Sequence, residues 1–309
     1  MNAEYLTHLK ARFLSRNYNY LWLKTMLDKG RTTTIPGSTL ITGSSYALNG
    51  IYERAWKNAI NCSMHSQDLY YDFQCARRVI SSTKNCRFKR CFIITAYYGA
   101  FHDVSLSKEI RKTWVSDIWY PIFHDAHNWD QPVQTDPWAA FENVPEQIRT
   151  ICENVATNTI LKSGTYYPDF RPRPPCVYLN GRTWSQASEE ERRSIGYDRS
   201  KEHNTLFKHK ASMVENKRIF QDFVRFLYSY NVTPIVVITP FTEEYNHGIL
   251  REMKESMLEL LDSVPEYIHY VDFNEITGLF ELEDFMDPDH LSAAGAKKMS
   301  TILVDMFGP

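Results

Sequence analysis

The sequence lacks several features that would assign it to a functional class immediately. Its 309 residues contain no uninterrupted apolar run of about 18 residues, the length that a membrane-spanning helix needs. The N-terminal segment MNAEYLTHLK holds no apolar stretch of the kind found in signal peptides. None of the six cysteines belongs to a CxxC pair. We therefore expect a cytoplasmic protein without a membrane span, whose cysteines are free thiols.

The sequence also lacks an excess of positive or negative charge, and it lacks a phosphate-binding loop. Its 35 Lys and Arg residues nearly balance 37 Asp and Glu residues, for a net charge of -2. This balance offers no large basic surface, so a nucleic-acid partner is not expected. No glycine-rich phosphate loop occurs, which disfavours a nucleotide-dependent enzyme. His124 and His127 have the spacing of a ligand pair, but no third ligand is identifiable, so we expect no metal and no other cofactor.

Aromatic residues, by contrast, are abundant. The chain has 19 Tyr, 17 Phe and 7 Trp, and its hydrophobic fraction of 43% is sufficient for a large core. Taken alone, the aromatic excess indicates either such a core or a surface on which a ligand stacks. The length fits one large domain or two ordinary ones.

Apolar periodicity predicts an alternation of strands and helices along most of the chain. The expected strands are residues 39–42, 58–64, 91–97, 234–239 and 268–273, and the expected helices are 2–29, 67–81, 213–230, 246–262 and 291–306. This alternation predicts an α/β fold, namely a three-layer, doubly wound parallel sheet of about five strands. In such a sheet, ligands bind outside the C-terminal ends of the strands.

The segment 103–200 differs in composition from the rest of the chain. It contains eight of the 14 prolines and five of the seven tryptophans, including the run Arg171-Pro-Arg-Pro-Pro, which fits neither a regular helix nor a central strand. We expect a single domain over 1–309, with an N-terminal helical extension over 1–36. Residues 103–200 are then a large loop-rich insertion between the third and fourth strands, and a candidate lid that binds substrate.

Two short motifs follow expected strands and can carry chemistry. Gly43-Ser44-Ser45 follows the first strand, where a glycine permits a sharp turn and a serine is presented to the cleft. In Asp287-Pro-Asp-His290, a carboxylate three residues before a histidine can orient the ring, which leaves the other ring nitrogen to deprotonate a hydroxyl. The alternatives are an ordinary turn for the first motif and a helix cap for the second. Together they predict a serine, histidine and aspartate at one edge of the sheet.

These motifs resemble the conserved blocks of the SGNH, or GDSL-type, hydrolases and the related O-acyltransferases. The first block resembles residues 42–50 (TGSSYALNG), the second residues 61–66 (NCSMHS), and the last residues 287–295 (DPDHLSAAG). The resemblance implies an SGNH, flavodoxin-like fold in which Ser45 is the nucleophile, His290 the base and Asp287 the residue that orients it. It further implies an oxyanion site and site wall that include Gly43, Asn61 and Ser66, to which we add Tyr98 as a candidate.

The sequence departs from this family in three places. Ser44 stands where the family has aspartate, so the nucleophile is Ser44 or Ser45, and position favours Ser45. Ser66 stands at the glycine of the second block, where its backbone amide remains available. The asparagine of the third block is absent from residues 96–103, which leaves Tyr97, Tyr98 or His102 to replace that oxyanion donor.

The resemblance implies a serine-dependent acyl-ester hydrolase or O-acyltransferase. Its substrate would be a carbohydrate carrying O-acyl groups, such as a bacterial surface or capsular glycan, or another acylated small molecule. His65 and His102 are candidate site-wall residues, and Trp119 and Trp129 are candidate contacts for sugar rings, although tryptophans that only anchor the insertion are an equal alternative. The competing hypothesis is a catalytically inactive SGNH-like protein that binds glycan or acts as a scaffold. The acyl group, the acceptor and the oligomeric state stay open.

Overall fold

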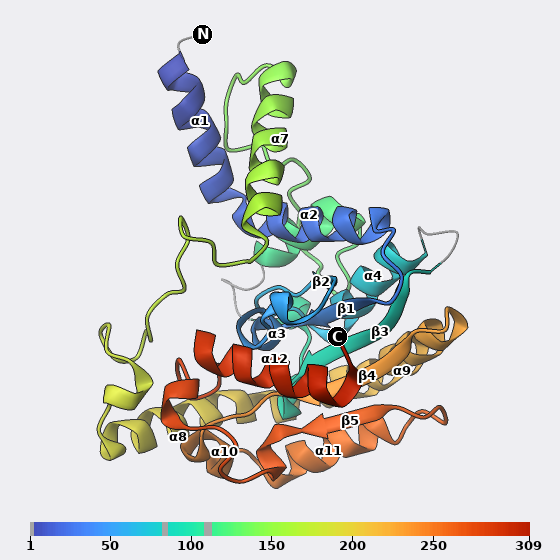
Figure 1. Cartoon of the computed structure of the whole chain (residues 1–309), viewed down its shortest axis with the longest axis vertical. Helices are drawn as coiled ribbons and strands as arrows, with labels where there is room; N and C mark the ends of the chain where they lie inside the picture. The colour runs from blue at the N-terminus through green and yellow to red at the C-terminus, as the bar shows by residue number, and fades with distance from the viewer. Residues whose placement is uncertain (1–2, 82–85, 108–112) are drawn as a thin grey trace. The chain divides into compact units, whose positions relative to one another are not determined.

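The computed structural model describes residues 3–81, 86–107 and 113–309 (Figure 1). The contacts divide the chain into two compact units. The first unit comprises Met1–Lys29 and Val104–Pro172, and the second comprises Gly30–Asp103 and Arg173–Pro309. In the described residues, no helix is long and apolar enough to cross a membrane.

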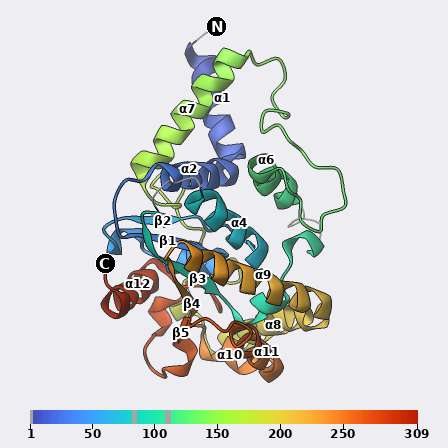
Figure 2. The same cartoon turned by 90° about the vertical axis from the view of Figure 1, so that its right-hand side faces the viewer.

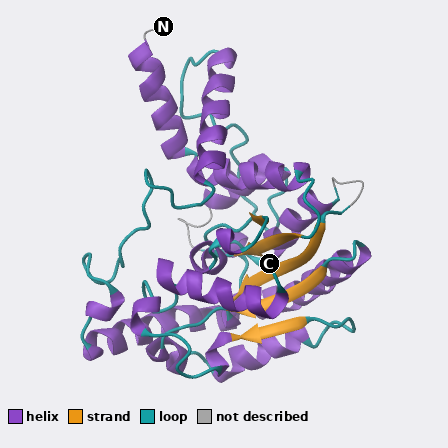
Figure 3. Ribbon diagram, viewed as in Figure 1, coloured by secondary structure: helices purple, strands orange, loops and turns teal. Residues whose placement is uncertain are grey.

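The second unit is built on one sheet of five parallel strands, drawn in orange in Figure 3. The strands are β1 (Ser38–Gly43), β2 (Ala59–Asn61), β3 (Phe88–Thr95), β4 (Thr233–Ile238) and β5 (His269–Asp272), in the spatial order β2-β1-β3-β4-β5. Every residue of β1 is buried, as is the apolar run of β3 from Cys91 to Ile94. Strands covered on both faces are typical of parallel sheets, so the α/β class predicted from the sequence is confirmed.

Helices cover both faces of this sheet (Figure 2). On one face α3 (Ser45–Gly50) packs against β1, β3 and α12 (Ala293–Phe307). On the other, α4 (Leu69–Ile80) packs against β1 and α9 (Lys210–Ser229), and α9 packs against β4 and α11 (Arg251–Leu261). Phe220, Phe223, Val224 and Leu227 of α9 form a buried apolar stripe, which explains why that helix packs on the sheet.

Two further helices of the second unit lie outside the sheet layers. These are α8 (Glu189–Asn204) and α10 (Glu243–Gly248), which pack against each other. The helix expected over 246–262 is therefore two helices, α10 and α11, separated at Ile249 and Leu250, which lie outside both. Short turns of 3₁₀-helix complete the unit: η1 (Glu53–Ala55), η2 (Tyr97–Phe101), η5 (Trp184–Gln186), η6 (Thr205–Lys208), η7 (Phe273–Glu275) and η8 (Leu282–Asp284).

The first unit is helical. It contains α1 (Ala3–Arg16), most of α2 (Tyr18–Thr32), η3 (Val104–Leu106), the π-helical turn η4 (Val115–Trp119), α6 (Tyr120–Phe123) and α7 (Glu146–Ser163). The single helix expected over 2–29 is interrupted at Asn17. Phe13 of α1 stacks on Trp138, with 3.9 Å between the ring centroids. Part of the aromatic excess therefore forms the core of this unit.

The segment expected to be loop-rich, 103–200, contains the two long helices α7 and α8, and the boundary between the units divides it after Pro172. Residues 1–2 of the expected extension and 108–112 of the expected insertion lie outside the described residues. The single domain over 1–309 and the lid role of 103–200 stay predictions.

Candidate active site

Ser45 is presented by the turn between β1 and α3. Gly43 ends the strand with φ of 142°, and a Cβ atom added there would clash with the carbonyl oxygen of Ile94 in β3. Only glycine fits this close approach. Ser44 is the N-cap of α3, and its Oγ accepts a hydrogen bond from the Tyr46 amide at 3.4 Å. Since Ser44 caps the helix, Ser45 is the serine whose side chain faces the histidine motif.

The three residues expected to act together lie in one hydrogen-bonded chain. Ser45 Oγ is 2.8 Å from His290 Nε2. His290 Nδ1 lies 3.0 and 3.1 Å from the two carboxylate oxygens of Asp287. An ionised carboxylate can accept hydrogen bonds but cannot donate them. The contact with Asp287 therefore places the imidazole proton on Nδ1 and leaves Nε2 to accept from the serine hydroxyl. The geometry therefore favours Ser45 over Ser44 as the nucleophile.

The turn that carries His290 is held by backbone contacts on both sides. Thr242 donates to the carbonyl oxygen of Pro288 through its amide at 3.1 Å and through its hydroxyl at 3.0 Å. Phe285 and Leu291 form an isolated antiparallel bridge across the turn. Arg173 Nη1 donates to the Leu291 carbonyl oxygen at 3.2 Å. These contacts fix the turn independently of the histidine ring.

A second carboxylate, that of Asp289, also lies beside His290. The sequence indicated only a helix cap for this residue. Asp289 is buried, and its carboxylate receives the Arg199 guanidinium at 3.0 and 3.2 Å and the Tyr46 hydroxyl at 2.8 Å. Burial alone would raise the pKa of Asp289. The positive charges of Arg199, His290 and His203 and the hydrogen bond from Arg199 together outweigh burial and hold that pKa well below its ordinary value. Neither Arg199 nor Tyr46 was a candidate in the sequence.

The charges around His290 favour its protonated form. Burial alone would lower the pKa of the imidazole, but the carboxylates of Asp287 and Asp289 raise it above its ordinary value of 6.5. A histidine in this environment is a stronger base, and it gains a proton at a higher pH than a histidine in water.

The second block forms a local network. Asn61 is buried, and its Oδ1 accepts from the amide of Ser63 at 3.1 Å while its Nδ2 donates to Glu53 at 2.9 Å. Ser66 has the left-handed φ of 55°, which is where the resemblance placed a glycine. His102 Nε2 donates to the Ser66 carbonyl oxygen at 3.1 Å, and His65 nearby is half-buried.

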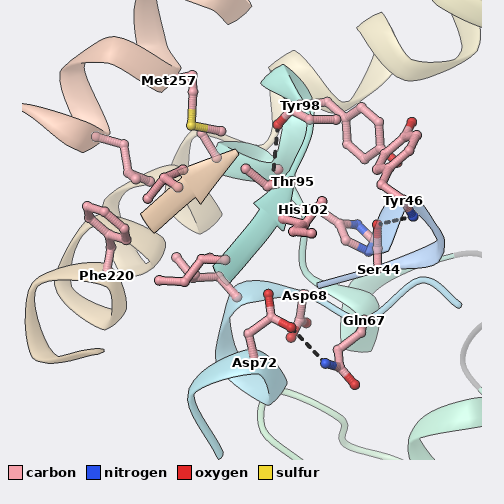
Figure 4. Close-up of a pocket in the computed structure, with 18 residues that line it drawn as sticks. Ser44, Tyr46, Gln67, Asp68, Asp72, Thr95, Tyr98, His102, Phe220 and Met257 are labelled. Atoms are coloured by element: carbon pink, nitrogen blue, oxygen red, sulfur yellow. Dashed lines mark hydrogen bonds between the residues drawn. The ribbon is translucent and has the colours of Figure 1, made fainter. Parts of the chain in front are cut away.

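The three replacements considered for the third-block asparagine have different surroundings. Tyr97 donates its hydroxyl to Asp272 at 2.6 Å, which directs it to β5. Tyr98 and His102 line a small cavity of about 30 Å³, together with Ser44 (Figure 4). The Tyr98 ring lies 4.1 Å from the His203 ring and 6.0 Å from the Tyr46 ring, between centroids. Tyr98 and His102 therefore lie beside the turn that carries Ser45, whereas the Tyr97 hydroxyl is bonded to Asp272.

The floor of this cavity contains a buried carboxyl group (Figure 4). Asp72 of α4 accepts a hydrogen bond from Gln67 Nε2 at 2.7 Å and another from the amide of Gly43. Burial raises the pKa of Asp72 to about 8, and the neighbouring Asp68 adds to the rise. Asp72 thus supports the backbone two residues before Ser45.

The two tryptophans considered as sugar contacts belong to the first unit. Trp119 is fully buried, so it offers no ring face to a ligand, and Trp129 is half-buried. The ligand atoms of Asp287, Asp289 and His290 lie within 4.8 Å of one another, as they could around a metal. However, Asp289 is already paired with the positive charge of Arg199, which opposes a cation there.

Comparison with known proteins gives little further information. No family model matches the chain, and no curated protein matches it either. One similar solved structure is described as that of "a putative platelet activating factor from Streptococcus pneumonia". The two chains are 11% identical over 99% of each, with a TM-score of 0.42. A likeness this low supports no conclusion about fold family or activity.

Proposed function

We propose that this protein is a serine-dependent acyl-ester hydrolase or O-acyltransferase with an SGNH-like active site. The observation that carries the proposal is the hydrogen-bonded chain from Ser45 through His290 to Asp287. Nothing local links these residues, because more than 240 positions separate Ser45 from His290. Their convergence at the C-terminal edge of a parallel sheet is where catalytic groups of such folds occur.

In the proposed reaction, Ser45 Oγ attacks the ester carbonyl carbon while His290 Nε2 takes the hydroxyl proton. Asp287 holds the ring and stabilises the positive charge that forms on it. Collapse of the tetrahedral intermediate breaks the ester C–O bond, and His290 returns the proton to the departing alcohol. Water or another hydroxyl then attacks the acyl-enzyme and gives its proton to His290. As the bond between the acyl carbon and Ser45 Oγ breaks, His290 passes that proton to Oγ and the free serine is restored. Water gives hydrolysis, and a second alcohol gives transfer.

The negative charge on the intermediate needs hydrogen-bond donors. We propose the backbone amides of Ser45 and Ser66, with Tyr98 or His102 as the third donor. The cavity that both of these side chains line is consistent with that assignment. Loss of one oxyanion donor costs about 3 kcal/mol in well-studied hydrolases, so each assignment has a measurable consequence.

A large groove next to the triad turn supports a carbohydrate substrate. It has a volume of about 1070 Å³ and is lined by residues of α10, η7 and η8 and by the loop containing Phe241 and Thr242. Thr242 holds the turn of His290, and the Phe241 ring lies 5.7 Å from the Tyr46 ring. Pockets for small ligands measure about 300–1,000 Å³. This groove therefore has room for several sugar units, and Thr242 in its lining contacts the turn that carries His290.

The test is hydrolysis of an aryl acetate and of an O-acetylated polysaccharide, together with covalent labelling by a fluorophosphonate. We expect the wild type and Ser44→Ala to be labelled and active, and Ser45→Ala to be neither. Ser44→Ala is the matched control, because it removes only a helix cap, at about 1 kcal/mol of stability. Labelling or turnover that survives in Ser45→Ala would refute the proposal.

The alternative is a glycan-binding protein without activity, and the loss of the third-block asparagine favours it. It predicts that the wild type binds an acetylated glycan without turning it over. It also predicts that His290→Ala binds this glycan with the same affinity as the wild type. Calorimetric titration of both proteins with the same glycan separates the two functions.

A further inference from the structure

A buried ion pair connects α8 to the turn that carries His290. Arg199 donates to Asp289 through Nε at 3.0 Å and through Nη2 at 3.2 Å, in a two-point contact. The exposed fraction is 12% for the Arg199 side chain and 0% for that of Asp289. A buried pair of this kind is seldom retained for stability alone, because desolvation offsets much of the attraction. Its position suggests a role in the site.

The same carboxylate also contacts the residue that follows the nucleophile. Tyr46 donates its hydroxyl to Asp289 Oδ2 at 2.8 Å. The Tyr46 ring stacks on the His290 ring, with 5.1 Å between centroids and 23° between planes. Asp289 Oδ1 itself lies 3.6 Å from His290 Nδ1. The Asp289 carboxylate therefore contacts both Tyr46 of α3, the residue after Ser45, and the His290 ring.

The helix that supplies Arg199 is closely docked. A Cβ atom added to Gly196 of α8 would lie 2.7 Å from the Cβ of Glu244 in α10. Arg192, one turn earlier, pairs with Glu244 at 3.1 Å, and His203 Nδ1 lies 2.5 Å from the Tyr245 hydroxyl. The close approach at Gly196 and the His203–Tyr245 contact, which lie on either side of Arg199, fix where its guanidinium lies.

We propose that Arg199 is a positioning residue, which clamps Asp289 and, through Tyr46, sets the approach of His290 to Ser45. This inference rests on the proposed function, because it assigns a role in the same reaction. The clamp also balances charge. Arg199 offsets the second carboxylate beside His290, so that the imidazole is influenced chiefly by Asp287.

The titratable and charged groups around His290 come from several elements. They are Asp287 and Asp289 of its own turn, Arg199 and His203 of α8, Tyr46 of α3, Tyr245 of α10, and Tyr178 of the segment before η5. Of these, the two carboxylates raise the pKa of His290, and Arg199 lowers it. Removing Arg199 should therefore raise that pKa, and removing the charge of Asp289 should lower it.

The first test follows the pKa of His290 by NMR and needs no substrate. The imidazole signal is assigned by its absence in His290→Gln. We expect the pKa to rise in Arg199→Met, to fall in Asp289→Asn, and to return toward the wild-type value in the double variant. The double variant also leaves no unpaired buried charge, so it is the one expected to fold if either single change does not.

The matched control is Arg192→Met. It removes an arginine from the same helix and from a comparably buried pair, with 15% exposure on each side. Its partner is Glu244 of α10, whereas the partner of Arg199 is Asp289. We expect no change in the pKa of His290. An unchanged pKa in Arg199→Met and Asp289→Asn, or an equal shift in Arg192→Met, would overturn the proposal.

The second test separates position from charge. Arg199→Lys retains the positive charge but not the two-point contact. On an aryl ester we expect kcat to fall by about tenfold to a hundredfold, as misplaced catalytic groups do, with KM little changed and the pH profile near that of the wild type. Wild-type kcat in this variant would refute the positioning role. If the wild type cleaves no ester, the proposed function fails while the NMR titration still decides the charge coupling.

Discussion

Replacement of Asp72 by asparagine tests whether a carboxyl group behind the nucleophile turn is neutral in the folded protein. Asp72 is 4% exposed and accepts hydrogen bonds from Gln67 and from the Gly43 amide. Burial raises its pKa from 3.8 to about 8, more than these hydrogen bonds lower it. Asparagine has nearly the shape of a protonated aspartic acid, so Asp72→Asn removes the ionisable group and retains most of the packing.

The sign follows from where the proton is held. Between the unfolded pKa of 3.8 and the folded pKa of about 8, the folded protein keeps a proton that the unfolded chain has released. The unfolding free energy therefore falls as the pH rises through this window, and it levels off above the folded pKa. Each unit corresponds to about 1.4 kcal/mol, so the loss from pH 5 to pH 8 is at most about 4 kcal/mol.

The assay is urea denaturation of the wild type and of Asp72→Asn at pH 5, 6, 7 and 8. We expect the unfolding free energy of the variant, minus that of the wild type, to increase by roughly 3–4 kcal/mol across this range. Glu259→Gln is the control, because it makes the same chemical change at a carboxylate that is 62% exposed. A difference for Asp72→Asn that is constant with pH would mean that the folded protein does not keep Asp72 protonated in this range.

Three further predictions concern the same edge of the sheet. Gly43→Ala should lower the unfolding free energy by at least about 2 kcal/mol in urea, because its Cβ would clash with the Ile94 carbonyl oxygen. Ser66→Gly should retain esterase activity and raise stability by up to about 1 kcal/mol, because φ of 55° suits glycine. Esterase activity should fall as the pH decreases through a His290 pKa above 6.5, so a pH–rate profile with its acid limb below that value contradicts the charge environment.

The strands and the meeting of Ser45, His290 and Asp287 could be predicted from the sequence because each leaves a local pattern. The run from Cys91 to Ile94 is fully buried and apolar, and a parallel strand covered on both faces requires such a run. Ser45 follows the fully buried strand β1, whereas His290 lies on a turn well after β5, in which only Val271 is buried. Parallel strands bring their C-terminal ends to one edge, so topology alone predicted that these distant residues meet.

The helices α7 and α8 were missed because they bury little. In α7 only Cys152, Ala156 and Ile160 are buried, and in α8 only Gly196, Ser200 and His203. Neither set forms the broad apolar stripe that identifies a packed helix in a sequence. Conversely, the tryptophans of this segment suggested a binding surface, yet Trp119, Trp138 and Trp184 are buried, and aromatic stacking in the first unit explains one of them.

The Arg199–Asp289 pair was beyond sequence analysis for a different reason. An arginine on a highly charged helix is usually solvated, and an aspartate before a helix usually caps it. The two residues form an ion pair only because the fold brings α8 against the turn of His290, 90 positions away in the chain. The charge that offsets Asp289 thus comes from a segment outside the motifs that resemble the SGNH blocks. If the clamp operates as proposed, changes within α8 would alter the pH at which His290 acts as a base and leave every motif residue in place.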